Sequence, residues 1–145
     1  IYKLFLRDIH TNYSLNKMCI KDTNICYLCE NDIESNSHLF ERCVVVKRLW
    51  ERLKEWLLNR GLGMCMFSMK NMLFESEAVN NNMVIRFVYI QCLMFIYACK
   101  LNNKIPWFEN FITKLYFVEK MEYLGYKAAG KLTSYVLKWG NISQL

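Results

Sequence analysis

The chain has 145 residues, 54% of them hydrophobic and 15% aromatic, and a formal charge of +6. This length suits one domain or two small ones, and this apolar content supports a packed core and argues against a globally disordered chain. One proline and five glycines favour helices over a turn-rich β fold, while the mild positive charge is compatible with nucleic acid but does not require it.

The N-terminal stretch predicts two short helices, 2–9 and 14–20, separated by the sequence HTN. Thr11 and Ser14 can each cap a helix start, because their hydroxyl oxygens accept hydrogen bonds from unpaired amides. Charged residues interrupt the first apolar run, which is not typical of a secretory signal. Since the chain begins at Ile1 rather than at methionine, we expect it to be a piece of a longer polypeptide.

The strongest helical pattern runs from Leu39 to about Asn59. Apolar residues recur there every three or four positions: Phe40, Cys43, Val46, Trp50, Leu53 and Leu57. Charged residues occupy much of the other side, so the pattern predicts an amphipathic helix with one face in a core. Gly61 and Gly63 are expected to end it, because glycine readily adopts the conformation found after helix C-termini.

The sequence SEAVNNNM is the clearest linker candidate, because asparagines disfavour helix propagation. A further helix is predicted over residues 83–100. Its apolar stretch from Met83 to Cys99 has 17 residues, at the lower limit (about 17–25) of a membrane span. Arg86 and Gln91 are costly at membrane depth without partners, so the buried helix of a core is favoured over a span.

Two more helices are predicted in the C-terminal part of the chain. The sequence LNNKIP is typical of a turn, and Pro106 suits the first position of a helix over 106–122, where the missing amide hydrogen costs nothing. A last helix is expected over about 127–139, after Gly125.

Four residues with metal-binding side chains fall in one 18-residue segment, with the spacing Cys26-x2-Cys29-x8-His38-x4-Cys43. Zinc prefers four such ligands in a closed tetrahedron, so the pattern predicts a structural zinc site. His38 and Cys43 would point about 140° apart on a regular helix. Cys43 can therefore lie in the first turns of the long helix only if His38 lies at or before its start, where Ser37 can act as a cap.

Three other interpretations of the cluster are weaker. A disulfide between Cys26 and Cys29 is disfavoured in a chain without a secretory signal. A redox pair would need a strand–helix context that the sequence does not indicate. Four unliganded residues would be expected in a core, whereas this loop is rich in polar side chains.

The remaining cysteines and the second histidine are assigned elsewhere. Cys19 is close enough to serve as a substitute ligand, but it falls in a helical stretch. Cys65, Cys92 and Cys99 have apolar neighbours and are expected to pack in a core. His10 is expected to be a surface or core histidine rather than a ligand.

In chain order, these features predict a mainly α fold: short helices around a Cys3His zinc knuckle, followed by a small C-terminal helical bundle. The predicted organisation is a zinc-binding domain over 1–60, a linker over 61–82 and a helical segment over 83–145.

The motifs CYLC and HLFERC, with Glu34 between them and Trp50 downstream, resemble the reverse-transcriptase zinc-binding domain (zf-RVT) of LINE-type non-LTR retrotransposon polyproteins. The preceding LFLRDIHTNYSLNKMCI is similar to the lead-in of that family. The stretch from IPWFENF to VLKWG resembles the C-terminal segment of the same polyproteins. Relatives often carry glycine after the second cysteine, where this chain has Glu30, which makes the tight thiolate turn less easy.

The resemblance implies a zinc-bound, non-catalytic tail of a transposable element's RNA-directed DNA polymerase. The ligands of the family fall on Cys26, Cys29, His38 and Cys43, and Trp50 is expected to pack as a core anchor. It further implies an intracellular protein of cytoplasm and nucleus, with RNA or DNA and the remainder of the parent polyprotein as partners. No membrane and no small-molecule substrate are expected.

Two functions remain open. In the first, the chain binds nucleic acid, with phosphate contacts from the long helix and the C-terminal segment at Lys47, Arg48, Arg52, Lys54, Lys127 and Lys131. Further lysines at 100, 104, 114, 120 and 138 extend the second set, and Tyr27, Tyr123 and Tyr126 are candidates for base stacking. Interleaved Glu51 and Glu55 weaken the helix patch.

In the second function, the chain is a structural or protein-interaction module that uses zinc only to fold and docks on the polymerase part without touching nucleic acid. An enzyme is disfavoured, because zinc hydrolysis needs an open coordination position and a nearby base, and a closed Cys3His set offers no such position.

Overall fold

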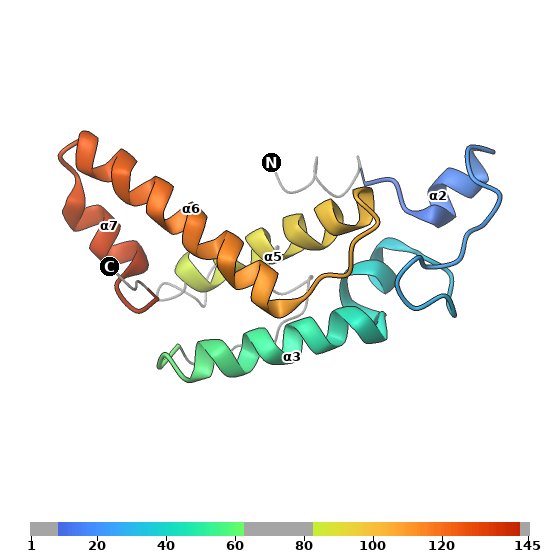
Figure 1. Ribbon diagram of the computed structural model, residues 1–145, viewed down its shortest axis with the longest axis horizontal. Coiled ribbons are helices and arrows are strands. Elements are labelled where there is room, and N and C mark those ends of the chain that lie inside the picture. Colours follow the sequence, from blue (N-terminus) through green and yellow to red (C-terminus); the bar gives the residue numbers. More distant parts are fainter. Residues whose placement is uncertain (1–8, 63–82, 143–145) are drawn as a thin grey trace.

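The computed structural model describes residues 9–62 and 83–142. Its thin grey segments in Figure 1 mark the rest of the chain. Several sequence predictions lie outside the described residues: nearly all of the helix over 2–9, most of the linker over 61–82, and the roles of Gly63 and Cys65.

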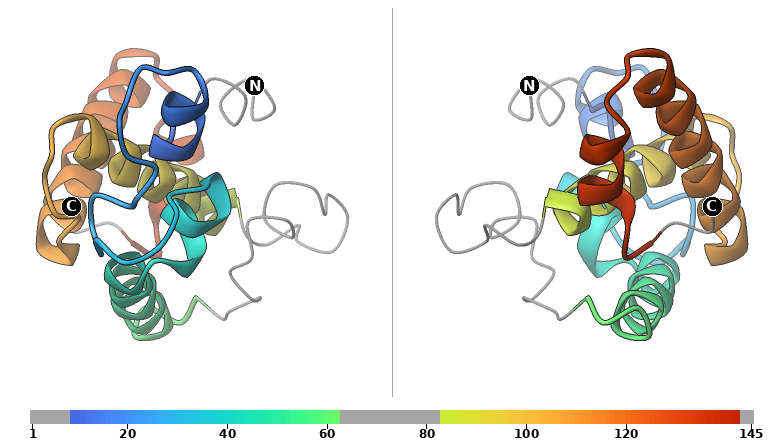
Figure 2. Two further views of the ribbon diagram at one scale, coloured as in Figure 1. Left: turned by 90° about the vertical axis from the view of Figure 1, so that its right-hand side faces the viewer. Right: turned by 90° about the vertical axis from the view of Figure 1, so that its left-hand side faces the viewer.

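The described chain is mainly helical, as the sequence predicts. Its elements in order are α2 (Asn12–Lys17), the π-helical turn η1 (His38–Arg42), α3 (Val44–Leu58), α5 (Met83–Leu101), α6 (Phe108–Ala128) and α7 (Leu132–Trp139). Within the described ranges, β structure is limited to one antiparallel bridge between Ile25 and Ile33. Figures 1 and 2 show an elongated body with α2 and the loop after it at one end and the α6–α7 hairpin at the other.

Helix α2 begins earlier than predicted, at Asn12 rather than at Ser14. The predicted cap at Thr11 is confirmed, because its side chain accepts a hydrogen bond from the Ser14 amide at 3.4 Å. Ser14 is not a cap. It lies inside the helix, where its hydroxyl donates to the Thr11 carbonyl at 2.9 Å.

The long helix predicted from Leu39 begins later, at Val44. Residues 38–42 form the separate turn η1, and Cys43 leaves the helical conformation with ψ 130°. Gly61 follows α3 at φ +69°, and the Leu62 amide donates back to the Leu57 carbonyl at 3.1 Å. Gly61 therefore ends the helix as predicted, in the left-handed conformation that glycine adopts without strain.

The predicted helix over 83–100 is confirmed as α5. Its window Val84–Leu101 is long and apolar enough to cross a membrane by length and composition, and 56% of it is buried inside the structure. Val88, Cys92 and Ile96 are fully enclosed along one face. This burial is what the core-helix interpretation requires.

The boundaries predicted for the last two helices are wrong. Pro106 lies before α6, and Trp107, with an extended ψ of 141°, is the residue that precedes its first turn. The helix then passes through Gly125, because glycine in a helix interior costs only about 1 kcal/mol. It ends at Ala128, and Gly130 (φ +68°) follows the cap residue, with the Lys131 amide donating to the Tyr126 carbonyl at 2.8 Å.

One buried core contains residues from both predicted parts of the chain. The N-terminal part contributes Leu39, Phe40, Val46, Leu53 and Leu57, and the C-terminal part contributes Val88, Cys92, Ile96, Phe111, Leu115 and Trp139. Helix α6 packs against α3, α5 and α7. The segment with the predicted zinc ligands is thus built onto a helical core, while the division into domains at 60 and 83 stays a prediction.

Candidate metal centre

The four predicted ligands converge at one point of the structure. One donor atom from each of Cys26, Cys29, His38 and Cys43 lies within 4.8 Å of all the others. Cys26 and Cys43 are buried, His38 is 4% exposed, and Cys29 is half-buried. The site is therefore closed on most sides by protein.

The spacing of the donor atoms fits zinc. The Cys26 and Cys43 sulfurs are 3.9 Å apart, and the Cys29 sulfur is 3.3 Å from His38 Nε2. Zinc–sulfur bonds of about 2.3 Å in a tetrahedron place two sulfurs about 3.8 Å apart, and a sulfur and a nitrogen slightly closer. The Cys3His cluster is thus consistent with bound Zn2+.

The first two cysteines are presented by a short hairpin. Ile25 and Ile33 form its antiparallel bridge, and the Cys26 amide donates to the Asp32 carbonyl at 2.8 Å. The Glu30 amide donates back to the Cys26 carbonyl at 2.9 Å, which closes the turn that holds both thiols on one side.

The π-helical turn η1 brings His38 and Cys43 together. The Cys43 amide donates to the His38 carbonyl at 2.8 Å, so the two ligands are joined by the five-residue hydrogen bond that defines this wide turn. A regular helix would have turned them apart. The cap is not Ser37, which makes no side-chain capping bond; instead the Ser35 hydroxyl accepts the His38 amide at 3.1 Å.

An acidic side chain faces the other ring nitrogen of His38. Asp32 Oδ2 lies 3.8 Å from His38 Nδ1. This is too long for a hydrogen bond, but a carboxylate on that side favours the proton on Nδ1 and leaves Nε2 free to bind metal. The geometry therefore assigns Nε2, the atom beside Cys29, as the ligand atom.

The thiols respond differently to their surroundings. Burial raises the pKa of Cys26 to about 12, and burial also raises the pKa of Cys43. Burial acts in the same direction on Cys29, but hydrogen bonds from the Asn31 and Asp32 amides outweigh it and lower its pKa. Zinc must displace protons from the two buried thiols, so metal binding releases protons and weakens as pH falls.

Glu30 adopts a left-handed conformation, with φ +54°. This conformation costs a non-glycine residue roughly 1–2 kcal/mol, and glycine's greater chain entropy offsets roughly 0.5–1 of that. Glu30→Gly is therefore expected to stabilise the zinc-loaded chain by about 0.5–1 kcal/mol, measured by urea unfolding.

Asn103 is the matched control for this substitution, because it has a similar φ of +50° outside the metal loop. Asparagine tolerates this conformation, so Asn103→Gly should gain less. A Glu30→Gly gain no larger than that of Asn103→Gly would show that the turn is not strained.

A buried ion pair joins the zinc knuckle, residues 25–43, to α5. Glu34 is completely buried, and one carboxylate oxygen accepts both the Asn12 amide, at 2.7 Å, and the ammonium group of Lys100. The other oxygen accepts the Tyr27 amide at 3.2 Å, and Lys100 also donates to Asn12 Oδ1 at 3.0 Å. The Glu34 carboxylate thus accepts hydrogen bonds from three parts of the chain: α2, the hairpin and α5.

Lys100 was assigned by sequence to an exposed phosphate-binding set, and this assignment is wrong. It is only 8% exposed. It continues the series Val88, Cys92, Ile96 at four-residue intervals, which is the buried face of α5. The sequence therefore contained a signal for its position, although none for its partner Glu34.

Trp50 links the π turn to the helical core. Its indole nitrogen donates to the Phe40 carbonyl at 2.7 Å, and its ring stacks on Tyr89 of α5 with centroids 4.9 Å apart. It is half-buried rather than enclosed, and it packs against the core as expected. The hydrogen bond from its indole nitrogen holds η1, which is not a regular α-helix, against α3.

Cys19, Cys92, Cys99 and His10 are not part of the ligand cluster, and Cys65 lies outside the described residues. Cys92 and Cys99 are buried, as expected for packing residues, and burial raises the pKa of both thiols. Cys19 is exposed and does not belong to the ligand cluster, and His10 is exposed.

The basic residues predicted on α3 are exposed, but they do not form one patch. Arg48 and Arg52 line a hollow beside residues 105–109, while Lys47 lines a different hollow, near Tyr89. Positions one apart on a helix differ by about 100°, which separates 47 from 48. Arg52 also forms an ion pair with Glu109 at 3.0 Å, which neutralises part of its charge.

Lys54 is exposed on α3, and Lys127 and Lys131 are exposed at the α6–α7 junction. That junction lies at the end of the molecule opposite the knuckle (Figure 1). The structure therefore does not bring the two predicted lysine sets together into a single surface.

Comparison with known proteins agrees with the geometry of the knuckle. Neither the curated proteins nor the solved structures gave a match to the chain. Residues 1–50, about a third of the chain, match the family model zf-RVT, described as zinc-binding in reverse transcriptase. The matched range contains all four cluster residues and Glu34, and it ends at Trp50, so this part of the chain is similar to zinc-binding segments of that type.

Proposed function

We propose that the chain is the non-catalytic C-terminal part of a LINE-type retrotransposon reverse transcriptase. In this proposal zinc stabilises the chain, which binds RNA or DNA to assist reverse transcription at the target. The observation that carries the proposal is the convergence of the four ligands within a segment that matches the zf-RVT family. The remainder of the parent polyprotein would be its second partner, in the cytoplasm and nucleus.

The coordination set supports a structural rather than a catalytic zinc. Three cysteines and one histidine fill a tetrahedron, which leaves no position for a water or substrate. The zinc then acts by holding the hairpin and η1 against α3 and α5.

Free positive charge on α3 supports contact with phosphates. Lys47, Arg48 and Lys54 have no acidic partner within residues 9–62 and 83–142, whereas Arg52 is paired with Glu109. Lysine and arginine side chains of this kind provide salt-sensitive binding with little reading of sequence.

A salt titration tests this function. The full 145-residue, zinc-loaded chain is expected to bind single-stranded RNA with an affinity that falls as salt rises, with a log–log slope near −2 for about three phosphate contacts at about 0.7 each. Fluorescence anisotropy with a labelled oligonucleotide measures the slope.

Two arginines on the same helix provide the control. Arg48→Ala should reduce the magnitude of the slope by about 0.7, while Arg52→Ala should reduce it less, because Glu109 already neutralises Arg52. Binding that is absent below about 100 μM, or independent of salt, would contradict nucleic-acid binding.

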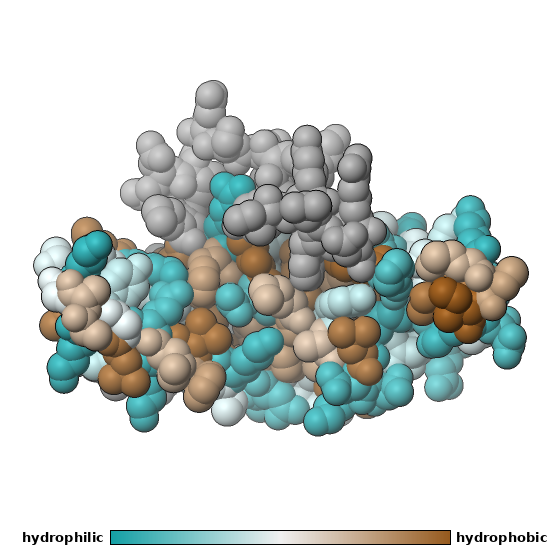
Figure 3. Space-filling view, turned by 90° about the horizontal axis from the view of Figure 1, so that it is seen from above, coloured by the Kyte–Doolittle hydropathy of each residue, from teal (hydrophilic) through white to brown (hydrophobic). Residues whose placement is uncertain are grey.

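Exposed apolar residues favour a second candidate, a module that docks on the polymerase part without touching nucleic acid. Phe117 on α6 is 64% exposed and Leu137 on α7 is 84% exposed. Figure 3 shows apolar side chains at the surface toward both ends of the molecule. Apolar surface of this kind is often covered by a protein partner. Absence of RNA binding together with binding to the polymerase part would favour this candidate.

A further inference from the structure

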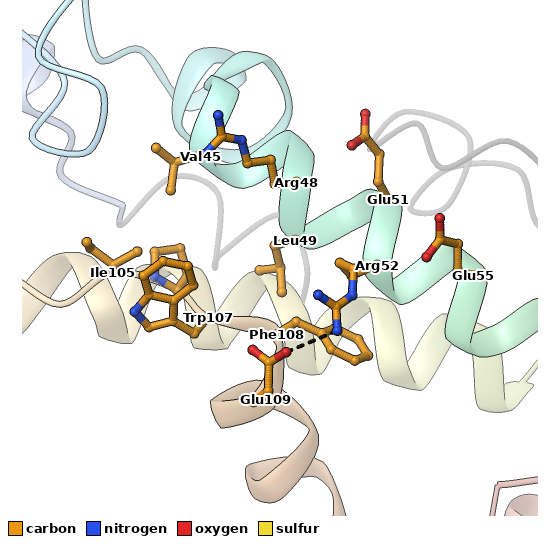
Figure 4. A pocket seen from close by; sticks show the side chains of 11 residues that line it. Val45, Arg48, Leu49, Glu51, Arg52, Glu55, Ile105, Trp107, Phe108 and Glu109 are labelled. Atoms are coloured by element: carbon orange, nitrogen blue, oxygen red, sulfur yellow. Dashed lines mark hydrogen bonds and ion pairs between the residues drawn. The ribbon is translucent and has the colours of Figure 1, made fainter.

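A hollow of about 440 Å³ lies between α3 and the corner that joins α5 to α6. Figure 4 shows Val45 and Arg48 on its α3 side and Ile105 and Trp107 on the other, with Leu49 at its floor. Its volume falls in the range of small-ligand sites, about 300–1,000 Å³. Its walls are mostly apolar and aromatic.

Trp107 gives the hollow a flat, accessible wall. The side chain is 59% exposed, although a tryptophan normally gains by burying its large apolar surface. Pro106 beside it is buried, and the Trp107 amide donates to the Ile105 carbonyl at 3.0 Å, so the corner is held while the ring faces solvent.

The corner is also attached to the zinc knuckle. The hydroxyl of Tyr27, the residue after the first zinc ligand, donates to the Lys104 carbonyl at 3.1 Å. This contact fixes the backbone just before Ile105. Hydrogen bonds thus hold the backbone on both sides of the Trp107 ring, at the Lys104 carbonyl before it and at the Trp107 carbonyl, which accepts the Phe111 amide at 3.1 Å.

The charges around the hollow are arranged unevenly. Arg52 is held by Glu109 at 3.0 Å and lies 5.1 Å over the Phe108 ring, so it forms part of the wall. Within residues 9–62 and 83–142 Arg48 has no acidic partner, so its charge remains available. Glu51 and Glu55 of α3 also line the hollow, where their carboxylates oppose the approach of additional phosphates (Figure 4).

We propose that this hollow binds one unpaired base of a single-stranded nucleic acid, stacked on Trp107, with the adjoining phosphate at Arg48. The inference rests on the proposed function and deepens it. A base is flat and apolar on its faces, as the Trp107 wall requires, and it brings one phosphate for Arg48, which has no acidic partner in the described part of the chain. Duplex bases are stacked on each other and cannot enter.

The test compares Trp107→Ala with Phe117→Ala, which removes an equally exposed aromatic ring from α6 outside the hollow. Binding of the full zinc-loaded chain is measured with single-stranded RNA, the same sequence as DNA, the matching duplex, and an oligonucleotide with abasic sites throughout. Circular dichroism and zinc content, unchanged in both variants, establish that the fold is intact.

Trp107→Ala is expected to weaken single-strand binding about tenfold, without changing the salt slope, because stacking releases no counterions. Phe117→Ala should change it less than twofold. The Trp107→Ala effect should vanish on the abasic strand and on the duplex, and comparison of RNA with DNA shows which strand is preferred.

Equal effects of the two variants, or a Trp107→Ala effect that persists on the abasic strand, would overturn the base site while leaving nucleic-acid binding in place. Failure of the unmodified chain to bind any strand would overturn the proposed function itself, and the base site with it.

Discussion

Removing zinc with a chelator is expected to unfold the knuckle at 25–43 and loosen the helices that pack on it. Structural zinc sites supply roughly 10–16 kcal/mol of apparent binding free energy at neutral pH, which is comparable to the whole stability of a small domain. Without metal, the buried thiols of Cys26 and Cys43 have only weak polar contacts. Circular dichroism and hydrogen exchange before and after chelation measure the change.

The response should be reversible and specific to the ligand cluster. Added zinc is expected to restore the original spectrum. Cys19→Ser, which alters an exposed cysteine outside the cluster, should respond to the chelator as the unmodified chain does. A metal-free chain that keeps the same exchange protection at 25–43 would contradict a structural role for the ion.

Lys100→Met is expected to destabilise the zinc-loaded chain by about 3–5 kcal/mol, because it leaves the buried carboxylate of Glu34 without its cation. Methionine keeps the length and apolar body of the side chain, so the loss reports the missing charge rather than a cavity. Urea unfolding followed by circular dichroism measures the free energy of unfolding.

The exposed ion pair between Arg52 and Glu109 provides the comparison, since its two side chains are 57% and 65% exposed. Glu109→Gln should cost less than about 1 kcal/mol. If Lys100→Met cost as little as Glu109→Gln, the pair between Glu34 and Lys100 would not be an essential link between the knuckle and α5.

The four residues of the candidate zinc site were predictable from sequence, because their types and local spacing follow from what zinc binds, and the structure brings them together. The path of the backbone between them was not. A five-residue spacing fits a regular helix poorly, and the structure solves this with η1 and its bond from the Cys43 amide to the His38 carbonyl. Periodicity rules assume regular helices and extended the long helix back through this turn to Leu39.

Residues that pair although they are far apart in the sequence were the second feature that the sequence could not predict. The buried stripe of α5 followed from apolar periodicity, and Lys100 falls on that stripe. Its partner Glu34 is 66 residues away in a polar loop, and local patterns carry no information about such pairs. Two glycines in the C-terminal part of the chain show the same limit on a smaller scale. Gly125 and Gly130 have the same intrinsic helix propensity, but only Gly130 has the positive φ angle that ends α6.

The arrangement of functional side chains on the surface was the third feature that the sequence could not predict. Four basic residues on α3 look continuous in sequence, but helical geometry places Lys47 and Arg48 on different edges, with Glu51 and Glu55 between them. The exposure of Trp107 depends on the turn before α6, and the helix predicted over 106–122 gave no indication of it.

Elemental analysis of the purified 145-residue chain tests the zinc site most directly. We expect one zinc per chain, its loss in His38→Ala, and its retention in Cys19→Ser. A folded chain that carries no metal, or a His38→Ala variant that keeps its full complement, would contradict the assignment of Cys26, Cys29, His38 and Cys43 as a closed zinc site.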